Sequence, residues 1–376
     1  MSHAPESTRA FDELIALLQQ IRDGYVLNQD RFDDPVDVAE GFRYVTEILA
    51  GASEMLIESD PDHPQMRPIV SPVRKLQGDN PDAIYHHARI RGDRSYRVYG
   101  VRGEESYISF TVHAEAPDGG FNGRVVADVN SEGFVFGRDG SYEIVFSAQP
   151  HEGNWVQIDS GAHRIITRSY FSRKKSAQND PTVQVRMGIE CLDDVPAPAP
   201  LDDTTLAARM REGIAWMRQT TLGQPLPGKS PIKAPFDSGV PNTVGTPWSF
   251  RNSGVTAAGA VDVFYSMGRF ELGPDQALVM RGTIPKGPFT NVMLWNRHMQ
   301  TLEYQFRCSS LNTEQITFEP DGSYVIVIAA KDPGVPNWLD TGGHRTGTIF
   351  WRYLLPETDP AVAKCEVVPL DRLRKS

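Results

Sequence analysis

The N-terminal part of the chain carries apolar side chains at helical spacing. Residues 10–22 show them every three or four positions, which predicts an amphipathic helix. A second helix should begin at Pro35, because Asp34 is a favourable N-cap and proline suits the first helical position. Both helices are expected to be packing elements. Their predicted apolar faces are Phe11, Leu14, Ile15, Leu18 and Ile21 in the first, and Val38, Phe42, Val45, Leu49, Ala52 and Leu56 in the second.

Beyond these helices, apolar and polar residues alternate over short runs. Residues 107–113 and 324–328 are examples, and a period of two predicts β-strands. An Asp-Gly pair at 139–140 and again at 321–322 predicts hairpin turns, because glycine adopts the positive φ that such turns need. Many short strands separated by turns predict a mainly β fold with helical additions, built from antiparallel, jelly-roll-like sandwiches.

The β-rich pattern occurs twice in the chain. Residues 130–148 (NSEGFVFGRDGSYEIVFSA) and 312–330 (NTEQITFEPDGSYVIVIAA) are identical at 10 of 19 positions without a gap. Asp93 and Asp275 keep the same offset of 182 residues. A duplication is the simplest explanation, so two copies of one sandwich are expected.

The duplication and the length of 376 residues predict two domains. Residues 1–194 should hold the N-terminal helices and the first sandwich. Residues 195–203 form a stiff Pro-rich linker that ends in a helix cap. Residues 204–376 should hold a helix, a long loop and the second sandwich, so that helices precede each sandwich. The loop, residues 224–255, is expected to be a lid, a subunit-contact arm or a wrapping connection.

Composition narrows the range of partners. A net charge of −10 argues against nucleic acid, which is bound through clustered basic residues. No stretch approaches the roughly 20 apolar residues of a membrane span, and the N-terminus lacks the pattern of a signal peptide, so a cytoplasmic protein without a membrane partner is expected. Serine-hydrolase, P-loop, zincin and dinucleotide motifs are absent, so we expect no cofactor and no metal. A small-molecule ligand is the expected partner, and a homo-oligomer is allowed.

Two motifs resemble a known family. One is the segment 337–345 (NWLDTGGHR), followed by Trp351-Arg352, and the other is 79–82 (DNPD) with Tyr85. Over most of residues 35–370 the chain resembles the bacterial DUF1214 family, which often occurs with DUF1254 in longer relatives. The resemblance implies an all-β sandwich architecture with helical additions, no settled biochemical role, and no catalytic residues that can be carried over. The chain departs from the family where Asn296-Arg297-His298 replaces an expected Asn-His-Trp.

Two candidate binding surfaces follow from strand periodicity. Tyr85, His87 and Arg89 should share one strand face, either in a binding site or as solvated groups on an edge strand. The aligned strands 107–113 and 289–295 place a polar row on one face in the first copy and an aromatic row with one amide in the second. That face suits a ligand groove, or else it packs against the other repeat or a subunit. The rows are Tyr107, Ser109, Thr111 and His113, and Phe289, Asn291, Met293 and Trp295.

The second copy has gained an acid, a base and a cation after its aromatic strand. We therefore expect His298 and Glu303 to act as acid-base groups, and Arg297 to hold an anion. Trp295 would form a platform for substrate. The complete set of predicted substrate-binding residues is Trp295, Asn296, Arg297, Tyr304, Tyr85, His87 and Arg89. The leading hypothesis is a cofactor-independent hydrolase or lyase acting on a small polar or carbohydrate-like molecule in a sandwich groove. The alternative is a non-catalytic ligand-binding or assembly module.

The most conspicuous matched residues are assigned a structural role. Residues 159–164 (DSGAHR) match residues 340–345 (DTGGHR) after two deletions. Such Asp and His residues could act in acid-base chemistry, but a metal site would need three or four ligands. Retention in both copies favours a role in locking loops. This set comprises Asp159, His163, Asp340, His344, Arg345 and Trp338.

Overall fold

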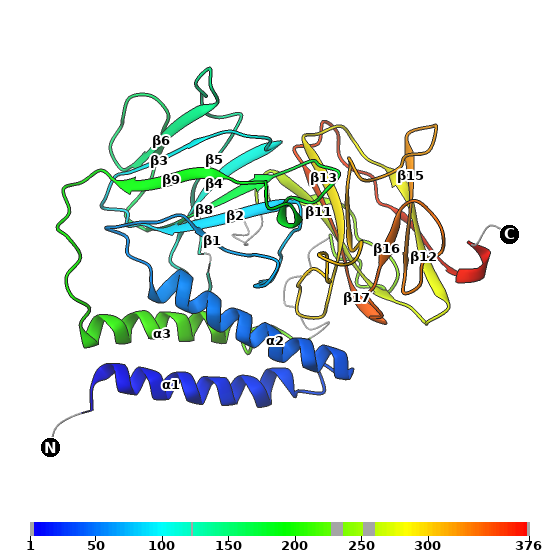
Figure 1. Ribbon diagram of the computed structural model, residues 1–376, viewed down its shortest axis with the longest axis horizontal. Helices are drawn as coiled ribbons and strands as arrows, with labels where there is room; N and C mark the ends of the chain where they lie inside the picture. The colour runs from blue at the N-terminus through cyan, green and yellow to red at the C-terminus, as the bar shows by residue number, and fades with distance from the viewer. Residues whose placement is uncertain (1–3, 122, 227–235, 251–259, 374–376) are drawn as a thin grey trace.

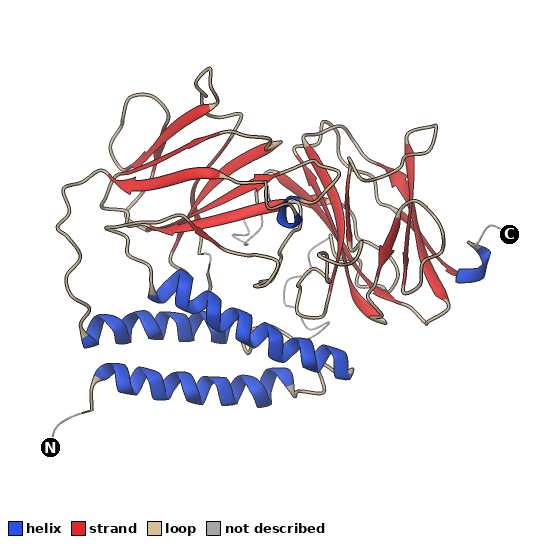
Figure 2. Ribbon diagram, in the orientation of Figure 1, coloured by secondary structure: helices blue, strands red, loops and turns tan. Residues whose placement is uncertain are grey.

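A computed structural model describes residues 4–121, 123–226, 236–250 and 260–373. Two β-sandwiches stand side by side, and three helices form a layer below them (Figure 1). Figure 2 shows that the strands are confined to the two sandwiches and the long helices to the single layer. The mainly β fold class with helical additions is therefore confirmed.

The helical layer consists of α1 (Glu6–Ile21), α2 (Pro35–Ala52) and α3 (Asp203–Gln219). Single π-turns extend α1 and α2, at Arg22–Val26 and Ser53–Ile57. The predicted start of α2 is confirmed, because the Asp34 side chain accepts a hydrogen bond of 2.9 Å from the amide of Val36. Short 3₁₀ turns occur at Ala177–Asn179 and Leu370–Arg372.

The predicted apolar faces of α1 and α2 are partly wrong. Phe42 is 43% exposed, whereas the neighbouring face of α2 is buried through Gly41, Tyr44, Ile48 and Gly51. A Cβ at Gly51 would lie 3.1 Å from the Trp216 ring, so α2 approaches its neighbours through small residues that a hydrophobic pattern does not count. In α1 the buried residues are Ala10, Leu17 and Ile21, and Phe11 and Ile15 are exposed.

Each sandwich contains a five-stranded and a four-stranded sheet with the same strand order. In the first repeat, the five-stranded sheet has the order β1 (Arg67–Pro68), β2 (Ala83–Arg89), β8 (Ala162–Tyr170), β4 (Tyr107–Ala114), β5 (Val125–Asn130). Its four-stranded sheet has the order β7 (Trp155–Gln157), β6 (Ser141–Ser147), β3 (Tyr96–Val101), β9 (Arg186–Cys191). In the second repeat, the five-stranded sheet has the order β10 (Trp248–Ser249), β11 (Val263–Glu271), β17 (Thr346–Leu354), β13 (Phe289–Trp295), β14 (Ser310–Asn312). Its four-stranded sheet has the order β16 (Trp338–Asp340), β15 (Ser323–Ala329), β12 (Gln276–Thr283), β18 (Lys364–Pro369). The pairs β6–β7 and β15–β16 are parallel, and the other pairs are antiparallel. The duplication is confirmed.

Strand pairing corrects one part of the sequence alignment. Arg164 lies opposite Arg89 in the first repeat, and Thr348 lies opposite the equivalent Arg269 in the second. The offset in this strand is therefore 184 residues, whereas matching the letters of His163 to His344 gives 181. The two Asp-His segments are not equivalent in register, because the turns before β8 and β17 differ in length.

A reciprocal set of hydrogen bonds joins the two repeats. Asp82, just before β2, accepts bonds from the side chains of Asn291 and Asn312 at 3.1 and 3.0 Å. The equivalent Asp262, just before β11, accepts bonds from the Tyr107 hydroxyl and the Asn130 side chain at 2.7 and 2.6 Å. We call these contacts the Asp-Asn clamps. They hold the outer faces of the two five-stranded sheets together, and both repeats contribute to the apolar cluster between those faces.

The helix α3 does not pack with the sandwich that follows it. Its N-terminal Asp203 accepts a hydrogen bond of 2.7 Å from the amide of Glu6 at the start of α1. Arg211 of α3 forms an ion pair with Glu13 of α1 at 3.1 Å. The Pro-rich segment 195–203 thus leads from β9 back to the helical layer, as Figure 1 shows. All three helices form one layer, rather than one helical lead-in for each sandwich.

We expect each Asp-Asn clamp to make a measurable contribution to stability. Asn130→Ala and Asn312→Ala each remove a donor from a buried carboxylate, so each should lower the free energy of unfolding by about 1.5–3 kcal/mol. Chemical denaturation measures this change. The matched controls are Glu132→Ala and Glu314→Ala, two residues further along each repeat, where the exposed side chains should contribute less than about 0.5 kcal/mol. Equal losses in the asparagine and glutamate variants would contradict the clamp.

Candidate functional site

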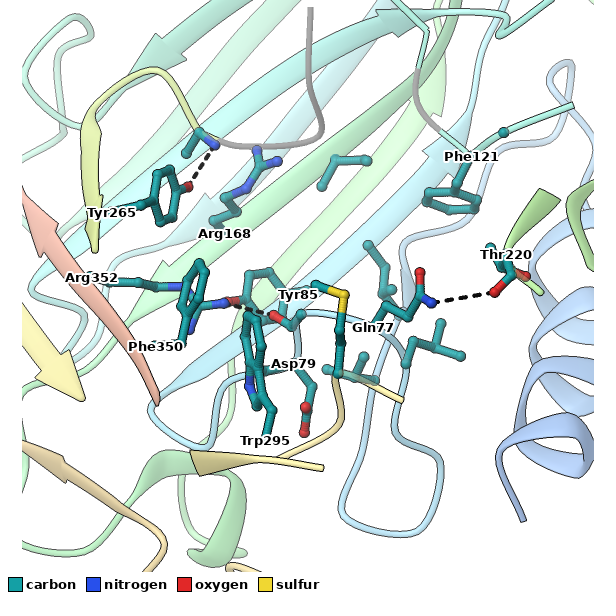
Figure 3. Close-up of a pocket in the computed structure, with 18 of the residues that line it drawn as sticks. Gln77, Asp79, Tyr85, Phe121, Arg168, Thr220, Tyr265, Trp295, Phe350 and Arg352 are labelled. Carbon is teal, nitrogen blue, oxygen red and sulfur yellow. Dashed lines mark hydrogen bonds between the residues drawn. The ribbon is translucent and has the colours of Figure 1, made fainter. Parts of the chain in front are cut away.

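A cavity of about 550 Å³ lies where the two five-stranded sheets meet the helical layer. The walls are mainly apolar, and Figure 3 shows side chains from both repeats around one space. The first repeat contributes Tyr85, Phe121, Ile166, Arg168 and Tyr170; the second contributes Tyr265, Met267, Trp295, Phe350 and Arg352; and the helices contribute Tyr44, Met55 and Trp216. In the long loop, residues 227–235 and 251–255 lie outside the described residues, and Phe236 and Phe250 line the cavity.

Four polar side chains in this cavity repeat in pairs. Tyr85 lies opposite Arg168 across β2 and β8, and Tyr265 lies opposite Arg352 across β11 and β17. We call these residues the Tyr-Arg quartet. Burial and the nearby Tyr170 raise the pKa of Tyr265 to about 12, and both arginines act to lower it. Burial likewise raises the pKa of Tyr85 well above its usual value, against the effect of the same arginines. Each tyrosine thus lies within the electrostatic field of both arginines.

The two arginines are buried without an acidic partner. Arg168 and Arg352 are 6% and 5% exposed, and neither forms an ion pair with a carboxylate among the described residues. Arg168 donates to the Thr111 hydroxyl at 2.7 Å, and Arg352 donates to the carbonyl of Gly78 at 2.8 Å. A buried cation without a counterion is unfavourable by several kcal/mol, so the cavity is electrostatically suited to an anion.

One carboxyl group also belongs to the cavity wall. Asp79 is 2% exposed, and its Oδ1 accepts bonds from the amide and hydroxyl of Thr301 at 2.6 and 3.0 Å. Burial raises the pKa of Asp79 to about 6, although the charge of Lys75 opposes the change. Such a group changes protonation near neutral pH, which is a property of acid-base residues.

Two of the predicted site residues line this cavity. Trp295 stacks on Phe350 with ring centroids 4.1 Å apart, and its indole NH donates to the Asp79 carbonyl at 3.3 Å. Tyr85 belongs to the Tyr-Arg quartet. The expectation that the strand-face row packs against the other repeat holds for Tyr107 and Asn291, which form the Asp-Asn clamps. The role of Trp295 as a substrate platform stays a prediction.

The predicted acid-base pair, His298 and Glu303, does not line the cavity. His298 is 1% exposed and binds the Tyr25 hydroxyl at 3.1 Å and the Asp37 carbonyl at 2.8 Å. Burial lowers the pKa of His298 to about 4. Glu303 binds Arg43 of α2 at 2.5 Å. Both residues therefore fasten the helical layer to the second repeat.

The neighbours of this pair have the same structural role. Asn296 donates to Glu40 of α2 at 3.0 Å, and its side-chain oxygen accepts from two amides of its own turn. Arg297 donates to the carbonyl of Arg31 at 2.5 Å, so it is not free to hold an anion in the cavity. Tyr304 lies under the Lys75 ammonium, 4.9 Å from the ring centroid. The structure does not bring these three predicted binding residues to the cavity.

His87 and Arg89 lie on the predicted strand face but outside the cavity wall. The His87 ring is 5.4 Å from that of Phe121, and its two nitrogens have no hydrogen-bond partner among the described residues. Arg89 pairs with Glu212 of α3. Although burial acts to raise it, a hydrogen bond from His163 and the charge of Arg89 lower the pKa of Glu212 to about 2.

The two Asp-His segments pair with other residues, not within themselves. Asp159 and Asp340 bind arginines, Arg124 at 2.6 Å and Arg307 at 2.9 Å. His163 lies 3.6 Å from Glu212 of α3, and His344 lies 3.1 Å from Glu40 of α2. Each histidine thus connects a sandwich to the helical layer, His163 from the start of β8 and His344 from the turn before β17. Trp338 donates to the Ala329 carbonyl at 2.9 Å, and Arg345 is exposed.

Sequence reasoning missed Arg168, Tyr265 and Arg352 as site residues. The available signal was an arginine inside a buried strand of each repeat, two residues before the strand ends. The three-residue shift in register hid the equivalence of the two arginines. The predicted acid-base residues lie at positions where the two copies differ, whereas the Tyr-Arg quartet of this cavity lies at positions that both copies share.

Neither a metal site nor a membrane span is found within the described part of the chain. No group of three or more His, Cys, Asp or Glu side chains there is arranged to hold a metal ion. No helix there is long and apolar enough to cross a membrane.

Comparison with known proteins agrees with the repeated architecture. A family described as a protein of unknown function, DUF1214, matches residues 86–174 and 277–358, in corresponding parts of the two repeats. The chain belongs to the DUF1214 family. This DUF1214 chain is 29% identical to an uncharacterized protein from Burkholderia cenocepacia, with a TM-score of 0.84 over 97% of this chain and 98% of the other.

A second solved structure shares the fold of this DUF1214 protein. The VPA0106 protein from Vibrio parahaemolyticus is 13% identical, with a TM-score of 0.50 over 87% of this chain and 97% of the other. No curated protein matches the chain. The relatives therefore support the fold and leave the activity to be argued from the site.

In this DUF1214 protein, removing an unpaired buried charge should not reduce stability. We expect Arg168→Met to maintain or raise the melting temperature without ligand, because methionine needs no counterion. The matched control is Arg164→Met, four residues earlier on β8. Arg164 is also buried, but it lies 3.6 Å from Glu212 and over the Phe121 ring, so its loss should lower the melting temperature by several degrees. Calorimetry measures both; a lower value for Arg168→Met than for Arg164→Met would contradict the assignment.

The contact between His344 and Glu40 should make stability depend on pH. Although burial acts to lower it, the hydrogen bond and charge of Glu40 raise the pKa of His344. Because folding raises this pKa, the contribution is complete below the unfolded value of about 6.5 and is lost as pH rises through the folded value. The stability difference between wild type and His344→Gln should therefore shrink from about pH 6 to pH 9 in urea denaturation. In a Glu40→Gln background this dependence should disappear; an unchanged difference across the range would refute it.

Proposed function

We propose that this protein binds a small organic anion, a carboxylic acid with an apolar body, in the cavity between its repeats. The observation that carries the proposal is the pair Arg168 and Arg352, buried in an aromatic-walled cavity without an ion pair to any carboxylate that the structure describes. Guanidinium groups match carboxylates through parallel hydrogen bonds, and these bonds strengthen when water is excluded. A bound carboxylate would give each guanidinium a direct ion pair, which neither forms with a carboxylate among the described residues.

The walls support an apolar body for this ligand. Ile166, Met267 and Phe350 line the cavity with Phe121, and such side chains offer no hydrogen bonds to hydroxyl groups. A carbohydrate would bury many hydroxyl groups against these walls without partners, which is unfavourable. The cavity volume of about 550 Å³ falls within the range of small-molecule sites. The non-catalytic binding alternative is therefore the better supported of the two sequence hypotheses.

A cofactor-independent hydrolase or lyase is the second candidate, and one observation favours it. Asp79 lines the same cavity with a pKa raised to about 6 by burial, which would allow it to act as a general base. His298 and Glu303, the original acid-base candidates, lie elsewhere. Breakdown of a bound acid by the wild type and not by Asp79→Asn would support the enzyme over the binding protein.

Ligand-dependent stabilisation tests the proposal. Aromatic carboxylates such as benzoate and naphthoate should raise the melting temperature, because a ligand at about 100 times its Kd stabilises the folded state by about 2.7 kcal/mol. The corresponding neutral amides, benzamide and naphthamide, should have little effect. Arg168→Met and Arg352→Met should each weaken the response to the acids by roughly tenfold or more in affinity.

The control variant is Arg97→Met. Arg97 lies on the outer sheet of the first sandwich and pairs with Glu190, so its loss should leave the response to carboxylates unchanged. Equal stabilisation by acids and amides would contradict the proposal. So would carboxylate binding that persists in both quartet variants, because the anion would then be bound elsewhere.

A further inference from the structure

The two arginines reach one cavity from opposite sheets. Arg168 belongs to β8 of the first repeat and Arg352 to the equivalent β17 of the second. Since the Asp-Asn clamps hold these sheets face to face, the repeat symmetry places one guanidinium on each wall. Figure 3 shows Arg168 beside Tyr265 of the other repeat, and Arg352 beside Phe350 at a separate position along the cavity. The site thus has two cationic positions.

The two positions have different neutral surroundings. Arg168 donates to the hydroxyl of Thr111 at 2.7 Å, whereas Arg352 lies 3.0 Å from the sulfur of the equivalent Met293. The Arg352 guanidinium also lies 4.7 Å from the ring centroid of Phe350. These neighbours orient the guanidinium groups and carry no negative charge themselves. Burial raises the pKa of Asp79 and Asp82, and the charge of Arg352 opposes this rise, so Arg352 lies within the electrostatic field of two carboxylates. Neither arginine forms a direct ion pair among the described residues.

Three carboxylates near the quartet accept hydrogen bonds from other residues. Asp79 binds Thr301, and both oxygens of Asp82 accept bonds from asparagine side chains of the second repeat. The Thr111 hydroxyl accepts a hydrogen bond from Arg168 at 2.7 Å and donates one to Asp128 at 2.6 Å. None of the three forms an ion pair with a quartet arginine. A ligand with one carboxylate would therefore leave one of the two buried arginines without a direct ion pair.

We propose that the ligand is a dicarboxylic acid, with one carboxylate for each arginine and an apolar body between them. This inference rests on the proposed function and specifies its ligand class. Two bidentate guanidinium-carboxylate contacts would neutralise both walls, and the aromatic side chains between them would cover the body of the ligand. The different surroundings of Arg168 and Arg352 favour a molecule whose two ends differ.

Matched pairs of acids test the inference on the full-length protein. Calorimetric titration compares benzoate with terephthalate, naphthalene carboxylate with naphthalene dicarboxylate, and biphenyl carboxylate with biphenyl dicarboxylate. The three bodies vary the distance between the two acidic groups. For at least one body, the dicarboxylate should bind at least tenfold more tightly than its monocarboxylate. In Arg168→Met and in Arg352→Met, this advantage should fall to less than about twofold, because each variant retains one cationic position.

The outcomes separate this inference from the proposed function. Monocarboxylates that bind as tightly as their dicarboxylates, with dependence on Arg168 or Arg352, would overturn the dicarboxylate and leave the anion site standing. No binding by either series would overturn both. If a methionine variant does not fold, Arg168→Lys and Arg352→Lys replace it; these variants keep the charge but lose the paired donors, so the dicarboxylate advantage should still fall. A dicarboxylate advantage that survives every arginine variant would overturn the inference.

Discussion

Two buried carboxylates hold this protein in its functional arrangement. Asp82 and Asp262 each lie at the start of a strand and take their hydrogen bonds from the opposite repeat, through Asn312 and Asn130 among others. A buried carboxylate needs such donors, because an unsatisfied charge is strongly unfavourable inside a protein. The repeats can satisfy both groups at once only when their five-stranded sheets face each other. That constraint brings the two halves of the Tyr-Arg quartet into one cavity.

The helical layer completes the cavity on its third side. Tyr44, Met55 and Trp216 line the space from the helices. Contacts from Glu40 and Arg43 of α2 to the second repeat keep the layer in place. The residues that looked most like catalytic groups belong to these contacts, since the interface between a helix and a sandwich loop also needs buried imidazole and charge pairs. A concentration of polar residues after a strand is therefore compatible with a purely structural interface.

The cavity combines what the repeats share with what distinguishes them. Both copies supply a tyrosine and an arginine on paired strands, and a site between two similar halves necessarily draws on such common positions. The copies differ in the residues beside the arginines, Thr111 in one and Met293 in the other. Shared residues set the charge of the site, and the differing ones make its two ends unlike. Buried arginines without ion pairs reduce stability, which is the usual consequence of preparing a site for a charged ligand.

The sequence by itself determined the duplication, the mainly β fold and the start of α2, because these depend on local periodicity, turn chemistry and capping. It also placed Tyr85 and Trp295 on the strand faces that line the cavity. Only the tertiary structure decided which face of α2 is buried, since Gly41 and Gly51 permit a close approach that hydrophobicity does not record. It alone decided that His298 is a packing residue and that Arg168 and Arg352 meet. Those outcomes depend on strand register and on contacts between segments far apart in the chain, which no local pattern of residues encodes.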